Sequence, residues 1–96
     1  MRKEKLIKIN LLEGDMEHEF KMVEAPEQIP RVISEFINEV RKAKNDVGTM
    51  VRAKRNWRDG SVILELIGYE DYALVIRNLQ MAELTAELKK AGVKFD

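Results

Sequence analysis

The feature that most constrains the fold is the dipeptide Asp59-Gly60, which stands between two runs rich in strand-forming residues. Asp-Gly is typical of a two-residue type I′ turn, because both central positions of that turn need a positive φ angle. We therefore expect a β-hairpin over 47–68 with Asp59 and Gly60 at its tip. This register would place Trp57 opposite Val62, with both side chains directed toward the core.

The opposite face of this hairpin is expected to be basic and to carry two aliphatic side chains. Its members would be Arg52, Lys54, Asn56, Arg58, Ser61, Ile63, Glu65 and Ile67. Lys54 is expected directly opposite Glu65, where a cross-strand pair of opposite charge contributes roughly 0.2 to 1 kcal/mol. Such a face is either open to solvent or covered by a partner.

A second hairpin is predicted earlier in the chain, over 5–23. Its first strand directs Ile7, Ile9 and Leu11 to one face, and the turn is expected at Glu13–Gly14. A slightly longer loop stays open as an alternative, because Glu is unfavourable at a positive φ angle. The only histidine, His18, would then lie opposite Ile9 on the apolar face in a structural role.

An amphipathic helix follows the first hairpin, with Pro26 and Pro30 near its start, where proline is tolerated. Its apolar positions have the spacing of one helical face. They are Ile29, Val32, Ile33, Phe36, Ile37 and Val40. We expect this face to be buried against the sheet.

Residues 69–91 allow two interpretations. Asp71 is an acceptable N-cap and Gly92 is a strong C-terminal signal, so that the favoured interpretation is one helix up to Ala91. The alternative makes 73–77, with the sequence ALVIR, a fifth strand. Residues 93–96 read as a short final strand or a tail.

Together these elements predict an α+β fold in the order ββαββα. Two hairpins would form a four-stranded antiparallel sheet, and two helices would pack on one of its faces. The 96 residues suffice for one core, which predicts a single domain over 1–96. The two hairpins also share residue types at a spacing of 46 positions: Lys8 and Lys54, Gly14 and Gly60, Glu19 and Glu65.

Charge is strongly segregated along the chain although the formal net charge is zero. The net charge is +3 over 1–12, −6 over 13–40, +6 over 41–58 and −3 over 59–96. Blocks of opposite sign can pair within the fold, pair between subunits or steer a charged partner. They can also lie on solvated faces with no further role.

Several classes of chemistry lack the residues that they need. The chain has no cysteine, which excludes disulfides, thiol nucleophiles and cysteine-based zinc sites. No phosphate-binding loop, HExxH, GxSxG or EF-hand pattern occurs. Asp15, Glu17 and Glu19 line one strand face and are expected to be solvated rather than to hold a metal. We therefore predict no catalytic, cofactor-binding or metal-ligating residue.

Neither targeting nor membrane insertion is indicated by the N-terminal pattern. The first apolar stretch is short and contains Lys8 and Asn10, so it lacks the core of a signal peptide. No apolar run approaches the length of a transmembrane helix. These observations predict a cytoplasmic protein that does not enter a membrane.

The leading functional hypothesis is a non-catalytic interaction module that self-associates or binds a protein partner. Apolar side chains on the last helix and on the outer hairpin face motivate it. The candidate interface comprises Met81, Leu84, Leu88, Ile63 and Ile67.

The alternative is a nucleic-acid-binding protein that uses the basic hairpin over 50–67. Its candidate contacts are Arg41, Lys42, Lys44, Arg52, Lys54 and Arg58. Two observations oppose it: the chain has no basic excess, and Trp57 is predicted to face the core. Trp57 could stack on a base only if the hairpin had a different register.

Overall fold

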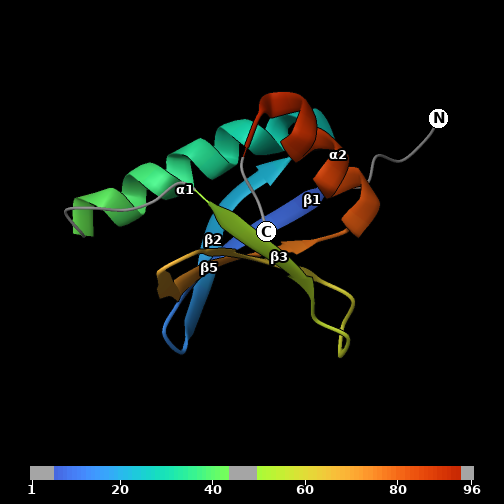
Figure 1. Cartoon of the computed structure of the whole chain (residues 1–96). Coiled ribbons are helices and arrows are strands. Elements are labelled where there is room, and N and C mark those ends of the chain that lie inside the picture. Colours follow the sequence, from blue (N-terminus) through green and yellow to red (C-terminus); the bar gives the residue numbers. More distant parts are fainter. Residues whose placement is uncertain (1–5, 44–49, 94–96) are drawn as a thin grey trace.

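The computed structural model describes residues 6–43 and 50–93, and it contains five β-strands and two α-helices (Figure 1). The elements are β1 (Ile7–Glu13), β2 (Met16–Val23), α1 (Ile29–Ala43), β3 (Val51–Arg55), β4 (Val62–Leu66), β5 (Tyr69–Arg77) and α2 (Met81–Ala91), with a 3-10 turn, η1 (Pro26–Gln28), before α1. The predicted α+β class is confirmed. The predicted four strands and ββαββα order are wrong, because the order is ββαβββα.

The strands form one antiparallel sheet in the order β2-β1-β5-β4-β3. The last strand in sequence, β5, is therefore central, and β2 and β3 are the two edges. Both helices lie over the same face of the sheet (Figure 1). The core lies between these layers and includes the fully buried Phe36 from α1 and Leu84 and Leu88 from α2.

Helix α1 forms where the apolar spacing predicts it. Five of its six predicted core positions are buried, and Ile37 is half-buried against the core. The turn η1 precedes it, with Pro26 in the first position, where a missing N–H breaks no helical hydrogen bond. The side chain of Gln28 accepts hydrogen bonds from the backbone N–H groups of Glu24 and Ala25 and so holds the entry to the helix.

The favoured interpretation of residues 71–91 as one helix is wrong. Residues 69–77 form β5, which extends the strand alternative, and α2 begins only at Met81. Asn78 separates the two elements with a φ angle of 68°. Residues 73–76 are all buried, since β5 is central: helices cover one of its faces, and longer side chains of β1 and β4 flank it on the other. A strand of that kind lacks the alternation that identifies strands at the surface.

Helix α2 ends as the sequence predicts. Gly92 adopts a φ angle of 76°, and its N–H bonds the carbonyl of Lys89 at 3.1 Å. The N–H of Val93 bonds the carbonyl of Leu88 at 3.0 Å, which completes a Schellman motif. The alternatives for 93–96 lie outside the described residues apart from Val93, which packs against the core.

The hairpin of β3 and β4 has a longer loop than the predicted Asp59-Gly60 turn. Arg55 pairs with Val62, and the N–H of Asn56 bonds the carbonyl of Ser61 at 2.8 Å. Residues 57–60 form the loop, so the predicted pairing of Trp57 with Val62 is wrong. The register differs by two residues, and each strand residue therefore keeps the face predicted for it.

The first hairpin also differs in register from the prediction. Its turn is Gly14–Asp15 rather than Glu13–Gly14, so that His18 lies opposite Leu11 and not Ile9. A β-bulge between Ile9 and Asn10 then changes the pairing along β2. Because β5 has no counterpart in the first half of the chain, the two halves do not repeat the same order of elements.

Candidate functional site: the open face of the sheet

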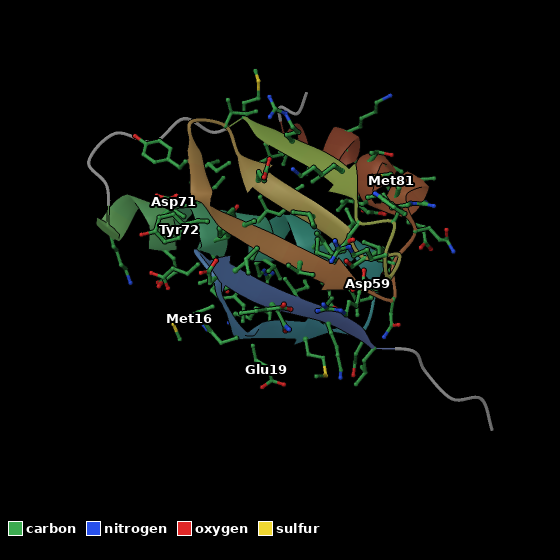
Figure 2. All side chains as sticks on the ribbon, turned by 90° about the horizontal axis from the view of Figure 1, so that it is seen from below. Met16, Glu19, Asp59, Asp71, Tyr72 and Met81 are labelled. Carbon is green, nitrogen blue, oxygen red and sulfur yellow. The ribbon has the colours of Figure 1, made fainter. Side chains whose placement is uncertain are left out.

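No helix within 6–43 and 50–93 covers the face of the sheet away from α1 and α2, and we refer to it as the open face (Figure 2). Directly paired residues on antiparallel strands project to the same face, so the registers identify which side chains share it. Two rows of paired residues cross all five strands. The first row is Glu19, Asn10, Val75, Ile63 and Lys54, and the second is Glu17, Leu12, Ala73, Glu65 and Arg52.

Both rows begin with a carboxylate on one edge strand and end with a cation on the other, and Glu65 precedes the cation in the second row. Glu17 and Glu19 lie on the edge strand β2, and Arg52 and Lys54 lie on the opposite edge strand β3. All four residues are exposed. Two carboxylates of the acidic segment 13–40 and two cations of the basic segment 41–58 therefore lie at opposite edges of one face.

Aliphatic side chains occupy the middle of the open face. Val75 and Ala73 on β5 are buried although no helix covers them, because longer neighbours on β1 and β4 flank them. Leu12 and Ile63, on those neighbouring strands, are half-buried. The apolar strip is thus narrow, and its two half-buried members are the ones that a partner could cover further.

At one end of the open face, an ionic network links β1, β2, β5 and the β3–β4 loop. Arg77 donates hydrogen bonds to Glu17 at 2.7 Å and to Asp59 in the β3–β4 loop at 3.5 Å. Asn10 donates a further hydrogen bond to Glu17 at 2.8 Å. Asp59 also accepts bonds from the backbone N–H of Ser61 at 3.0 Å and from its hydroxyl at 2.7 Å.

These contacts shift the pKa of each ionisable member. The hydrogen bond from Arg77, with that from Asn10, lowers the pKa of Glu17. The two bonds from Ser61, with a smaller effect of Arg77, lower the pKa of Asp59. Conversely, the hydrogen bond to Glu17 raises the pKa of Arg77. All three groups are held in their charged forms, as a structural network requires.

The predicted ion pair of Lys54 with Glu65 forms, although the two residues are not directly opposite. Lys54 pairs with Ile63 in the register, and its Nζ reaches Glu65 diagonally at 3.3 Å. The Glu65 side chain is 14% exposed and that of Lys54 is 54% exposed. The carboxylate is therefore largely enclosed, while the ammonium remains accessible from the open face.

The four described residues among those predicted to contact nucleic acid do not gather in one place. Arg52 and Lys54 lie on the open face and Arg58 lies in the β3–β4 loop, beside the C-terminal end of β5. Lys42 lies near Tyr72, at the other end of β5, and pairs with Glu39. The side chain of Arg41 and all of Lys44 lie outside the described residues.

The residues predicted for an oligomer interface are also divided. Leu84 and Leu88 are completely buried in the core of the chain itself, so they are not available to a partner. Met81 is half-buried against the same core. Ile63 lies on the open face and Ile67 in the turn between β4 and β5, and both are half-buried.

Trp57 is the residue that the sequence analysis misplaced most. It lies in the β3–β4 loop and is 87% exposed, rather than packed in the core. Arg55 and Arg58, its neighbours in sequence, are exposed as well. No local signal distinguishes the four-residue loop from the two-residue turn that Asp-Gly normally favours.

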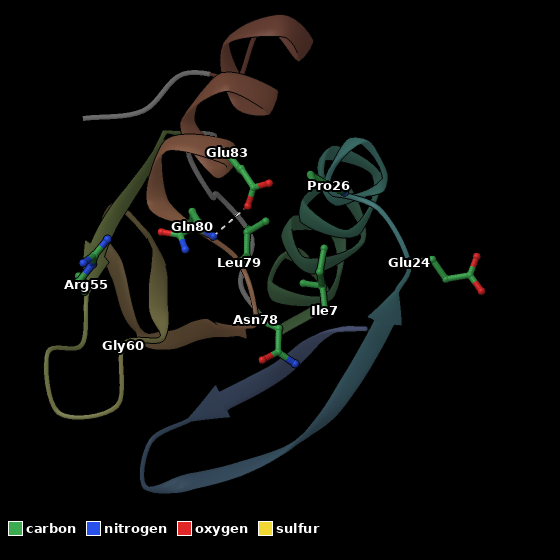
Figure 3. A pocket seen from close by; sticks show the side chains of 9 residues that line it. All are labelled: Ile7, Glu24, Pro26, Arg55, Gly60, Asn78, Leu79, Gln80 and Glu83. Atoms are coloured by element: carbon green, nitrogen blue, oxygen red, sulfur yellow. Dashed lines mark hydrogen bonds between the residues drawn. The ribbon is translucent and has the colours of Figure 1, made fainter. Parts of the chain in front are cut away.

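A cleft of about 520 Å³ lies among the start of β1, the β3–β4 hairpin and the segment between β5 and α2 (Figure 3). Its lining mixes acidic Glu24 and Glu83 with Arg55. Glu83 already accepts a hydrogen bond from the Gln80 N–H at 3.1 Å, and Asn78 donates to the Leu6 carbonyl at 2.8 Å. Glu83 and Asn78 are thus already engaged with the chain itself.

Other kinds of site have little support in the structure. Within 6–43 and 50–93, no group of three or more His, Asp or Glu side chains could hold a metal ion. The His18 side chain is half exposed, and its Nε2 lies 3.8 Å from Oε1 of Glu13. Across those same ranges, no helix is both long and apolar enough to span a membrane.

Comparison of the chain with family models, with curated proteins and with solved structures gives no match. Any functional argument therefore depends on the geometry of this chain alone.

Proposed function

We propose that this protein is a non-catalytic interaction module that self-associates through the open face of its sheet. The observation that carries the proposal is the polarity of that face, which is acidic along β2 and basic along β3. A surface with this pattern is complementary to a second copy of itself turned by half a rotation. A uniformly acidic or basic face would instead repel its own copy.

The aliphatic strip supplies the second part of the argument. Ile63 and Leu12 lie beside the centre of the face and are only half-buried in the single chain. Covering them removes apolar surface from water, which favours association by about 25 cal/mol per Å². The charged edges then set the orientation, as charges around an apolar centre do in many interfaces.

The size of the face is compatible with a weak, specific dimer. Five strands spaced about 4.8 Å apart, rising about 3.3 Å per residue over some six residues, give a face of roughly 24 by 20 Å. Two such faces would together bury on the order of 1,000 Å², near the lower limit for a specific interface. We therefore expect a dimer that dissociates on dilution.

Light scattering and analytical ultracentrifugation over a range of protein concentrations would test this function. The expected result is a monomer–dimer equilibrium that shifts toward monomer at high salt, because exposed charges are screened. Ile63→Arg should abolish the dimer and leave the far-UV circular dichroism unchanged. The matched control is Asn38→Arg, on the exposed side of α1, which should dimerise normally. A wild-type monomer at every concentration would refute the proposal.

The exposure of Trp57 favours a second candidate, binding of single-stranded nucleic acid at the β3–β4 loop. An exposed aromatic ring with exposed arginines close to it in the sequence resembles the stacking platforms of such proteins, in which each stacked base contributes about 1 to 3 kcal/mol. Trp57 is the only tryptophan, so quenching of its fluorescence by an oligonucleotide would report contact directly.

A salt titration separates phosphate contacts from non-specific attraction. Arg58→Ser should reduce the slope of log affinity against log salt by roughly 0.7 for one lost single-strand contact. Lys42→Ser, at the opposite end of the sheet, should leave the slope unchanged. Absence of both quenching and gel retardation at about 50 mM salt, where screening is weak, would exclude this candidate.

A further inference from the structure

We propose a specific arrangement for the self-association: two copies stack their open faces about a two-fold axis that runs parallel to the strands and passes over β5. This inference rests on the proposed function and adds the orientation of the partner. It makes the acidic edge of each copy lie over the basic edge of the other. The resulting dimer would have four layers, with helices outside and two sheets in contact.

Charge decides between the two simple orientations of such a stack. An axis parallel to the strands exchanges the two edges, so β2 of one copy lies over β3 of its partner. An axis across the strands lays β2 over β2 and β3 over β3, which would oppose Glu19 to the partner's Glu19 and Lys54 to the partner's Lys54. Like charges brought together at an interface disfavour that orientation.

Strand order makes the parallel axis geometrically consistent. Because β5 is the third of five strands, β2 and β3 lie at equal distances from it, two strand spacings away. Rotation about an axis over β5 therefore places each edge strand of one copy over the opposite edge strand of its partner. Glu19 and Lys54 end the same row of paired residues, so Glu19 would face the partner's Lys54.

The side chains along β5 fit the position of the axis. A charge over the axis would be brought close to its own copy, so the residues there should be uncharged. Ala73 and Val75 are the residues of β5 that project to the middle of the open face; both are uncharged and are already buried by longer neighbours in the single chain. Arg77 lies at the end of the strand, where Glu17 and Asp59 neutralise it.

Single-cysteine cross-linking can test this arrangement, because the natural chain contains no cysteine. We would prepare Glu19→Cys and Lys54→Cys, both exposed positions, and treat them alone and mixed with a short bis-maleimide. In the proposed dimer the two positions face each other across sheets about 10 Å apart. The two Glu19→Cys positions of one dimer would instead be separated laterally by about four strand spacings, or roughly 19 Å.

The expected result is a cross-linked dimer in the mixture of Glu19→Cys with Lys54→Cys, and much less from either variant alone. Asn38→Cys, exposed on α1, is the control for random collision and should not cross-link. Efficient cross-linking between two Glu19→Cys chains would overturn the proposed axis parallel to the strands, but the protein would still self-associate. A monomeric protein would overturn both the arrangement and the proposed function.

Pairing of edge strands is the remaining arrangement that could bring these two positions together. Joining β2 of one copy to β3 of the next is a head-to-tail contact, which continues into longer assemblies. Light scattering of the uncross-linked wild type distinguishes the cases. A mass that levels off at the dimer supports the proposal, and a mass that keeps rising with concentration overturns it.

Discussion

Arg77 on β5 donates a 2.7 Å hydrogen bond to Glu17 on β2, and the two side chains meet across β1, which separates their strands. The residues are 60 positions apart in the sequence. This contact therefore links the edge formed by the first hairpin to the centre of the sheet. It also keeps two charges on the open face in fixed positions.

The Arg77–Glu17 pair should contribute modestly to stability. Both side chains are about one-third exposed, so solvent screens their attraction. We expect a double-mutant cycle with Arg77→Gln and Glu17→Gln to give a coupling of about 0.5 to 1 kcal/mol by urea unfolding. A coupling of zero would show that the contact does not hold the first hairpin in place.

Acidification should destabilise the protein partly through this network. The pKa values of Glu17 and Asp59 are lowered in the folded state, so the unfolded chain binds protons more readily. Their stabilising contribution is present above the unfolded pKa values and is lost as pH falls through the lower folded values, from about pH 5 downward. Arg77→Gln should flatten this part of a stability–pH profile. An unchanged profile would contradict the prediction.

Phe36→Ala should destabilise the fold by about 3 to 5 kcal/mol, because it leaves a cavity between α1 and the sheet. Phe36 is fully buried in the described core. Ser34→Ala, two residues earlier and exposed, is the matched control and should change the free energy of unfolding by no more than about 0.5 kcal/mol. Urea unfolding of the two variants measures the difference.

Trp57→Ala should be nearly neutral for stability, within about 0.5 kcal/mol, because its ring is exposed in the β3–β4 loop. The two-residue turn would instead bury this ring, and its removal would then cost roughly 3 to 5 kcal/mol. Urea unfolding of this variant, followed by circular dichroism, thus decides between the two registers. The wild-type fluorescence should also be that of a tryptophan in water.

The wrong prediction for β5 shows a case that sequence patterns cannot resolve. Residues 73–76 form a continuous apolar run, which fits a buried strand or a segment of a buried helix equally well. Gly92 and the preceding lysines indicate a helix end correctly, but no signal in the sequence marks Asn78 as the point before which that helix cannot extend. Only the pairing of β5 with β1 and β4 identifies the strand, and those partners are distant in sequence.

The side chains of β3, β4 and α1 that face the core can be read from residue spacing alone, because strand and helix periods are local properties of the chain. The same spacing also determined that Arg52, Lys54 and Ile63 share an outer face, and that assignment survived a register error of two residues, since alternation has a period of two. The tertiary structure decided the strand order, which puts β5 in the centre and β2 and β3 at opposite edges. Strand order depends on contacts between distant segments, so only the folded chain places Glu17 and Glu19 at one edge of a single face and Arg52 and Lys54 at the other.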